Sequence, residues 1–147
     1  MKDEVRKKIF YLPIGRLTRL KLLHFFSIVG IDEKKEKTFL NFENDNQSIG
    51  FLYRLIITNA YKYNVPKVYI NECVDIKRKY DSFKKQNKHK LDSNKDVYIL
   101  NTFNNICVKL YTTFNRLMDA TIELYDIKNS RKNKIQSLLE KIYDKNN

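Results

Sequence analysis

The longest periodic segment of the chain lies in its C-terminal half, between Ser93 and Lys128. Apolar residues recur there at alternating steps of three and four, which places them on one stripe of an α-helix. The stripe consists of Leu100, Phe103, Cys107, Leu110, Phe114, Leu117, Thr121 and Leu124. Other apolar residues, such as Ile106 and Met118, widen it beyond the seam of a two-stranded coiled coil. We therefore predict a central helix over about residues 93–128, about 50 Å long, with neighbours on more than one side.

Shorter amphipathic patterns precede and follow this segment. Helical spacing predicts elements over residues 3–12, 16–29, 49–63, 66–83 and 131–143. Ser93 and Asp96 resemble a capping box at the start of the central helix, and Asn129 and Ser130 are expected to separate it from the last helix. Residues 84–94 lose the periodicity and are expected to form a charged loop.

Two segments admit a second interpretation. A helix ending at Gly30 competes with a small β-hairpin near residues 25–43, in which the two strands flank the charged sequence DEKKEK. A short strand at residues 67–71 competes with the start of a helix after Pro66.

Glycine and proline are scarce, with three and two residues, and this favours a few long helices over turn-rich β folds. We predict a mainly α, single domain over residues 1–147, with five or six helices around the central one and the last helix packed along it. The hairpin would make the fold α+β.

The chain is strongly basic, with 29 Lys and Arg against 17 Asp and Glu and a net charge of +12. A polyanion such as nucleic acid selects for this balance. However, Lys outnumbers Arg 22 to 7, Asn and Ile are abundant and Ala occurs twice, which is typical of a coding sequence poor in G and C. Part of the charge is therefore expected to reflect codon usage.

The densest cationic stretch covers residues 77–90, and a second group lies near the N-terminus. Flexible ammonium groups bind phosphate backbones without reading sequence, whereas the arginine fork binds two phosphate oxygens at once. The residues predicted to bind nucleic acid are Lys77, Arg78, Lys79, Lys84, Lys85, Lys88, Arg16 and Arg19. Tyr80 and Phe83 continue an apolar stripe and are expected to face the core rather than stack on bases. The competing interpretation of this stretch is a solvated charged helix end.

Few residues favour an enzyme. His24 and His89 are the only histidines, Cys73 and Cys107 lack CxxC spacing, and no Gly-rich phosphate loop is present, so we predict no metal and no cofactor. Arg19 to His24 resembles, by its Arg-x4-His spacing, the motif of HEPN ribonucleases, helical bundles whose paired Arg and His act on RNA. The resemblance covers six residues, lacks the polar residue that usually follows the arginine and does not lie on the C-terminal helix, so the chain is not assigned to that family.

No apolar run approaches the ~18 residues of a membrane span, and the N-terminus lacks the apolar core of a signal peptide. Both cysteines occupy apolar helical positions, as reduced thiols do, so a cytoplasmic location is expected.

The function predicted is a non-enzymatic basic module that contacts RNA or DNA backbone as an accessory part of a larger assembly. The alternative is a small protein-interaction module, encoded by a virus, phage or plasmid, that binds or inhibits an acidic protein surface.

Overall fold

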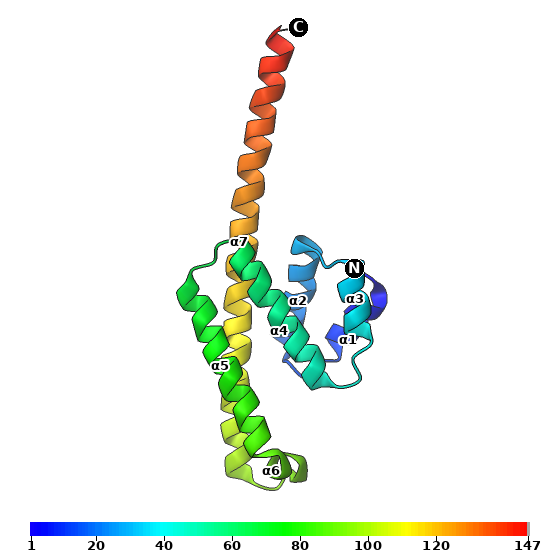
Figure 1. The fold of residues 1–147 in the computed structure, drawn as a ribbon, viewed down its shortest axis with the longest axis vertical. Coiled ribbons are helices and arrows are strands. Elements are labelled where there is room, and N and C mark those ends of the chain that lie inside the picture. The colour runs from blue at the N-terminus through cyan, green and yellow to red at the C-terminus, as the bar shows by residue number, and fades with distance from the viewer. Residues whose placement is uncertain (147) are drawn as a thin grey trace.

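The computed structural model describes residues 1–146, and these form seven helices and no strand (Figure 1). The helices are α1 (Asp3–Phe10), α2 (Arg16–Val29), α3 (Glu33–Leu40), α4 (Asp45–Lys62), α5 (Lys67–Gln86), α6 (Lys88–Ser93) and α7 (Val97–Asn146). The predicted mainly α fold is confirmed. The number of helices exceeds the five or six expected because the charged segments 33–40 and 88–93 each form a short helix.

The N-terminal half of α7 is the centre of the fold, as its periodicity predicts. Helices α2, α4 and α5 pack against it, and α1 and α3 complete a layer beside α2 (Figure 1). The stripe residues Leu110, Phe114 and Leu117 are 0–1% exposed. Because three helices surround this half of α7, its apolar face is wider than a coiled-coil seam.

The prediction of a separate last helix packed along the central one is wrong. Helix α7 continues without interruption through Asn129 and Ser130 to Asn146, and its C-terminal part projects from the body of the protein (Figure 1). Asn and Ser lower helix propensity by a few tenths of a kcal/mol each, and no Gly or Pro occurs within α7. These two residues are therefore too weak to end the helix.

The start of α7 also differs from the prediction. Ser93 belongs to the last turn of α6, where its hydroxyl donates to the Lys90 carbonyl at 3.1 Å. Asp96 caps α7 instead, because its carboxylate accepts the backbone N–H of Ile99 at 3.1 Å.

The structure contradicts the alternative strands and the predicted charged loop. Residues 25–43 contain the end of α2 and the whole of α3, and residues 67–71 belong to α5. Gly30 ends α2 with φ +81°, a conformation that favours glycine. Asp32 then caps α3 by accepting the N–H of Lys35 at 2.8 Å, so the DEKKEK sequence begins a helix rather than a hairpin loop. Residues 84–94 complete α5 and form α6.

Candidate functional site

Four of the eight predicted nucleic-acid-binding residues lie on the outside of the end of α5 and the start of α6. They are Arg78, Lys79, Lys85 and Lys88, which we call the α5–α6 surface. All four side chains are exposed, and no carboxylate among the described residues lies within ion-pair distance of them. Lys90 and Lys95, which are also exposed, extend this surface toward the start of α7.

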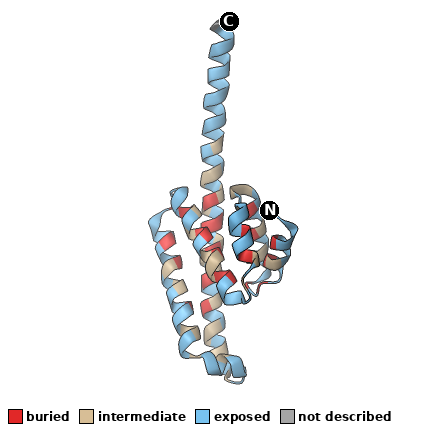
Figure 2. Cartoon of the chain, turned by 45° about the vertical axis from the view of Figure 1, so that its right-hand side comes forward, coloured by how far each residue is buried: buried red, intermediate tan, exposed pale blue. Residues whose placement is uncertain are grey.

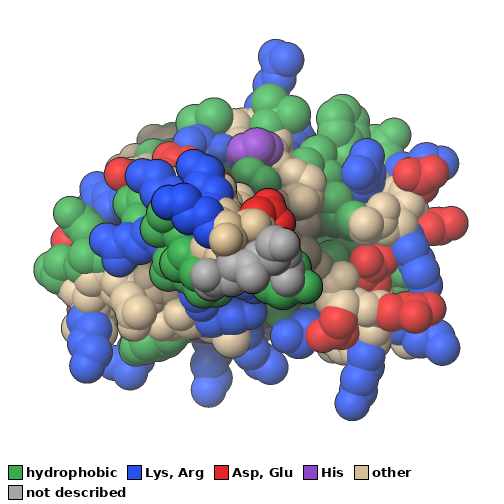
Figure 3. Space-filling view, turned by 90° about the horizontal axis from the view of Figure 1, so that it is seen from above, with side chains coloured by type: hydrophobic (Ala, Val, Ile, Leu, Met, Phe, Trp, Pro, Cys, Tyr) green, Lys and Arg blue, Asp and Glu red, His purple; other side chains and the backbone are tan. Residues whose placement is uncertain are grey.

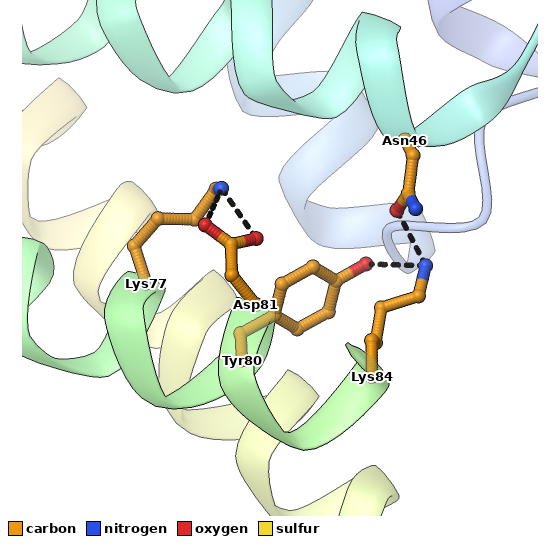
Figure 4. Close-up of polar contacts among 5 residues, drawn as sticks. All are labelled: Asn46, Lys77, Tyr80, Asp81 and Lys84. Carbon is orange, nitrogen blue, oxygen red and sulfur yellow. Dashed lines mark hydrogen bonds and ion pairs between the residues drawn. The ribbon is translucent and has the colours of Figure 1, made fainter. Parts of the chain in front are cut away.

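Lys77 faces α4 rather than solvent (Figure 4). Its ammonium group donates to both carboxylate oxygens of Asp81 at 2.8 and 2.7 Å, and its side chain is only 12% exposed. It also lies 5.3 Å from the ring centroid of Tyr53 on α4. Lys77 therefore stabilises the packing of α5 on α4, and we exclude it from the candidate nucleic-acid interface.

Lys84 has a similar structural role. Its ammonium group donates to the side-chain oxygen of Asn46 at the start of α4, and lies 3.4 Å from the Tyr80 hydroxyl (Figure 4). It lies over the Tyr80 and Phe103 rings, 5.2 and 5.9 Å from their centroids. Burial lowers the pKa of this lysine. Lys84 is thus a second contact between α5 and α4 rather than a free cation.

The aromatic residues of the same stretch face the core, as predicted. Tyr80 is 3% exposed and Phe83 is half-buried. Both stack on Phe103 of α7, with ring centroids 5.5 and 6.0 Å apart. The α5–α6 surface therefore presents charge without these two rings for nucleic-acid bases.

The two α2 arginines lie apart from the α5–α6 surface. Helix α2 lies on one side of α4 and α7, and α5 lies on the other, in both views of the molecule (Figures 1 and 2). Arg16 is exposed, but Arg19 donates to the Leu12 carbonyl at 3.3 Å and lies 5.6 Å from the Phe10 ring centroid. The two cationic groups do not form one continuous face.

Arg19 and His24 do not converge on a common point. Both lie on α2, five residues apart, so their side chains leave the helix about 140° from one another. Arg19 is turned toward the Leu12 carbonyl, and His24 is exposed. Within one chain this geometry lacks the paired Arg and His of a ribonuclease site.

The C-terminal part of α7 is a surface that the sequence prediction missed. We call residues 126–146 the arm, and every side chain from residue 131 to 145 is exposed (Figure 2). Five large apolar side chains on it are 56–69% exposed: Ile135, Leu138, Leu139, Ile142 and Tyr143. Their spacing predicts an apolar face packed on the central helix, whereas the structure leaves this face exposed.

A recess lies where the arm leaves the body. It has a volume of about 540 Å³ and we call it the root recess. It is lined by Lys62 at the end of α4, by Tyr63 and Asn64, which follow that helix, and by Leu124, Ile127, Lys128, Arg131, Lys132 and Ile135 of α7. The ammonium groups of Lys62 and Lys128 lie 5.4 and 5.5 Å from the Tyr63 ring centroid. The recess therefore combines an aromatic and aliphatic lining with four cations.

Positive charge is also spread more widely. Seen from above, Lys and Arg side chains line most of the outline of the molecule, whereas Asp and Glu gather mainly on the right of the view (Figure 3). Among residues 1–146, no cluster of three or more His, Cys, Asp or Glu is arranged to hold a metal ion. No helix in this range combines the length and apolar character needed to cross a membrane.

Comparison with known proteins finds no family model, no curated protein and no solved structure that matches this chain.

Proposed function

We propose that this protein is a non-enzymatic basic module that contacts the phosphate backbone of RNA or DNA, as an accessory part of a larger assembly. The observation that supports this is the α5–α6 surface, on which Arg78, Lys79, Lys85 and Lys88 are exposed and form no ion pair with the described carboxylates. Such cations are free to replace the counterions of a nucleic acid.

The chemistry of this surface fits backbone contact rather than base reading. Three of its four residues are lysines, which bind phosphate as point charges, and Arg78 adds a planar fork that binds two phosphate oxygens. Tyr80 and Phe83 are turned inward, so they supply no stacking platform for bases. The proposal therefore predicts binding with little sequence preference.

Binding to oligonucleotides should depend steeply on salt. About four neutralised phosphates predict a slope of roughly −3 to −4 in a plot of log K against log salt concentration, and a loss of about 100-fold between 50 and 200 mM salt. Fluorescence anisotropy with labelled single-stranded and duplex oligonucleotides of unrelated sequence measures the affinity at each salt concentration. Replacing Arg78, Lys79, Lys85 and Lys88 with glutamine should remove most of the slope.

A matched variant separates a local site from overall charge. Arg6, Lys7, Lys34 and Lys37 are exposed on α1 and α3, away from the α5–α6 surface. Their replacement with glutamine also removes four positive charges. This control should keep most of the affinity and the slope. The proposal fails if no oligonucleotide binds at 50 mM salt, or if both variants lose affinity equally.

A further inference from the structure

The arm is an amphipathic helix whose apolar face is exposed and packs against no other helix among residues 1–146. Ile135, Leu138, Leu139, Ile142 and Tyr143 follow one another at steps of three and one, which places them on a single face. Ile135, Leu138 and Ile142 continue the same three-and-four spacing as the buried residues of the body. A face of this kind is typical of a helix that packs against another apolar surface.

The charges within this face are all positive, and one of its two edges is lined by lysines. At 100° per residue, Lys134, Lys141 and Lys145 line one edge of the apolar stripe, and Lys128, Arg131 and Lys132 lie within it near the body. Glu140 lies beside the other edge, next to Leu139 and Tyr143, and Asp144 lies on the opposite side of the helix. A partner that covers the stripe therefore meets the three cations within it and the three along one edge, whereas Glu140 is the one carboxylate of the arm that borders it.

This pattern excludes a second copy of the arm as the favoured partner. Antiparallel pairing of two arms brings the two lysine edges together, and parallel pairing brings Lys128, Arg131 and Lys132 against their own counterparts. Such like-charge contacts favour a different partner. The complementary surface is apolar and edged by carboxylates.

The root recess indicates the shape of that partner. It is a concave site of about 540 Å³ in line with the stripe, lined by Tyr63, Leu124, Ile127 and Ile135 and by the cations Lys62, Lys128, Arg131 and Lys132. A side chain projecting from a partner helix can enter such a recess, whereas the flat surface of a bilayer does not reach into it. The partner that fits both features is a helix with apolar residues along one face and Asp or Glu beside them.

We propose that the arm, together with the root recess, is the docking site for an acidic amphipathic helix of another protein. This goes beyond the proposed nucleic-acid contact and does not depend on it, because the two surfaces share no residue. In the complex, apolar side chains of the partner cover the stripe, and its carboxylates pair with the flanking lysines and with the cations of the recess.

The test uses a designed peptide of about 21 residues with leucines at helical a and d positions and glutamates beside them. Two further peptides serve as comparisons: one with lysines in place of the glutamates, and one with the acidic sequence scrambled to remove the apolar face. Fluorescence anisotropy should show micromolar binding of the acidic amphipathic peptide and at least ~30-fold weaker binding of the other two.

Two variants of the protein locate the site. The double variant Leu138→Asp and Ile142→Asp should weaken binding at least ~30-fold. The double variant Asn133→Asp and Ser137→Asp changes the charge equally on the opposite face and should stay within about threefold. Neither pair touches the body, so near-UV circular dichroism should remain unchanged for both.

Other occupants of the stripe give distinct results that would overturn the proposal. A concentration-dependent dimer in analytical ultracentrifugation, lost with Leu138→Asp, would assign the stripe to a second copy. Binding to anionic but not neutral lipid vesicles, without binding to the acidic peptide, would assign it to a membrane surface. Equal binding of the acidic and the lysine peptide would show that charge does not select the partner.

Discussion

Phe114→Ala should lower the free energy of unfolding by about 3–5 kcal/mol, whereas Leu138→Ala on the same helix should change it by less than ~0.5 kcal/mol. Phe114 is 1% exposed and packs beside Tyr53 and Tyr111, with ring centroids 6.2 Å away in both cases. Removing its ring leaves a cavity between α4 and α7. Leu138 is 58% exposed, so its removal leaves no cavity, and alanine is a good helix former.

Urea unfolding followed by near-UV circular dichroism, which reports the packed aromatic residues of the body, measures both variants. The experiment is done at several protein concentrations, because a dimer formed through the arm would make the stability of the unsubstituted protein, and therefore the loss caused by Leu138→Ala, depend on concentration. A decrease in the free energy of unfolding above about 1.5 kcal/mol for Leu138→Ala, or below about 1 kcal/mol for Phe114→Ala, would contradict the division of α7 into a packed half and an exposed arm.

Raising the pH above about 9 should destabilise the fold, because the core holds protons that the unfolded chain releases. Burial raises the pKa of the Cys73 thiol from 9.0 to about 11 and that of Tyr53 from 10.0 to about 12. Burial also raises the pKa of Tyr80, Tyr111 and Cys107. Cys73 is 0% exposed, and the rise in its pKa from 9.0 to about 11 alone corresponds to roughly 3 kcal/mol of the free energy of unfolding.

The direction follows from proton linkage. Each group whose pKa is raised by folding contributes stability that is fully present below its unfolded pKa. This contribution is lost as the pH rises through the folded pKa, which for Cys73 means from 9.0 to about 11. Lys8 and Lys84 oppose this trend in part, since burial lowers the pKa of each and deprotonation relieves their desolvation. The five thiol and phenol groups outnumber these two lysines.

Urea unfolding followed at 222 nm across pH 7–11 measures the effect, with Cys73→Ala as the control. In the Cys73→Ala variant the free energy of unfolding should fall less steeply with rising pH. The difference in slope is up to one proton, or about 1.4 kcal/mol per pH unit, in the window where Cys73 titrates. A free energy of unfolding that stays constant or rises between pH 8.5 and 10.5 would contradict the burial of these groups.

The central helix could be predicted because its apolar residues keep a regular phase over many turns. The same phase also indicates that the helix continues beyond Lys128. The three-and-four spacing continues through Leu124, Lys128, Arg131 and Ile135 without a shift, and a break at residues 129–130 would have disturbed it. Asn129 and Ser130 are only weak helix breakers, so the unbroken phase indicates one continuous helix rather than two.

The same reasoning explains which cations could be assigned correctly. The prediction that Lys77 and Lys84 bind nucleic acid rests on the local density of charge. These lysines stand at steps of four and seven from Cys73 and Lys77, on the stripe that also contains Tyr80, so their helical spacing indicates instead that they face the core. Arg78, Lys79 and Lys85 lie off that stripe, and they are the ones that remain exposed. Whether α2 shared a face with α5 could not be predicted, because that depends on how three helices pack around α7.

The two proposed surfaces lie toward opposite ends of α7, which has 50 residues and a length of about 75 Å (Figure 1). The α5–α6 surface lies near its N-terminal end, and the arm forms its C-terminal end. A molecule that bound partners at both proposed surfaces would hold them at opposite ends of one helix.

The continuity of α7 can be measured directly by pulsed electron paramagnetic resonance between spin labels at Tyr98→Cys and Tyr143→Cys, both highly exposed positions. The native thiols label slowly near pH 7, because burial shields both and raises their pKa values. One continuous helix predicts a distance of about 68 Å between the two positions. A helix that breaks at residues 129–130 and folds back along the body would give about 30 Å, and that result would contradict the projecting arm.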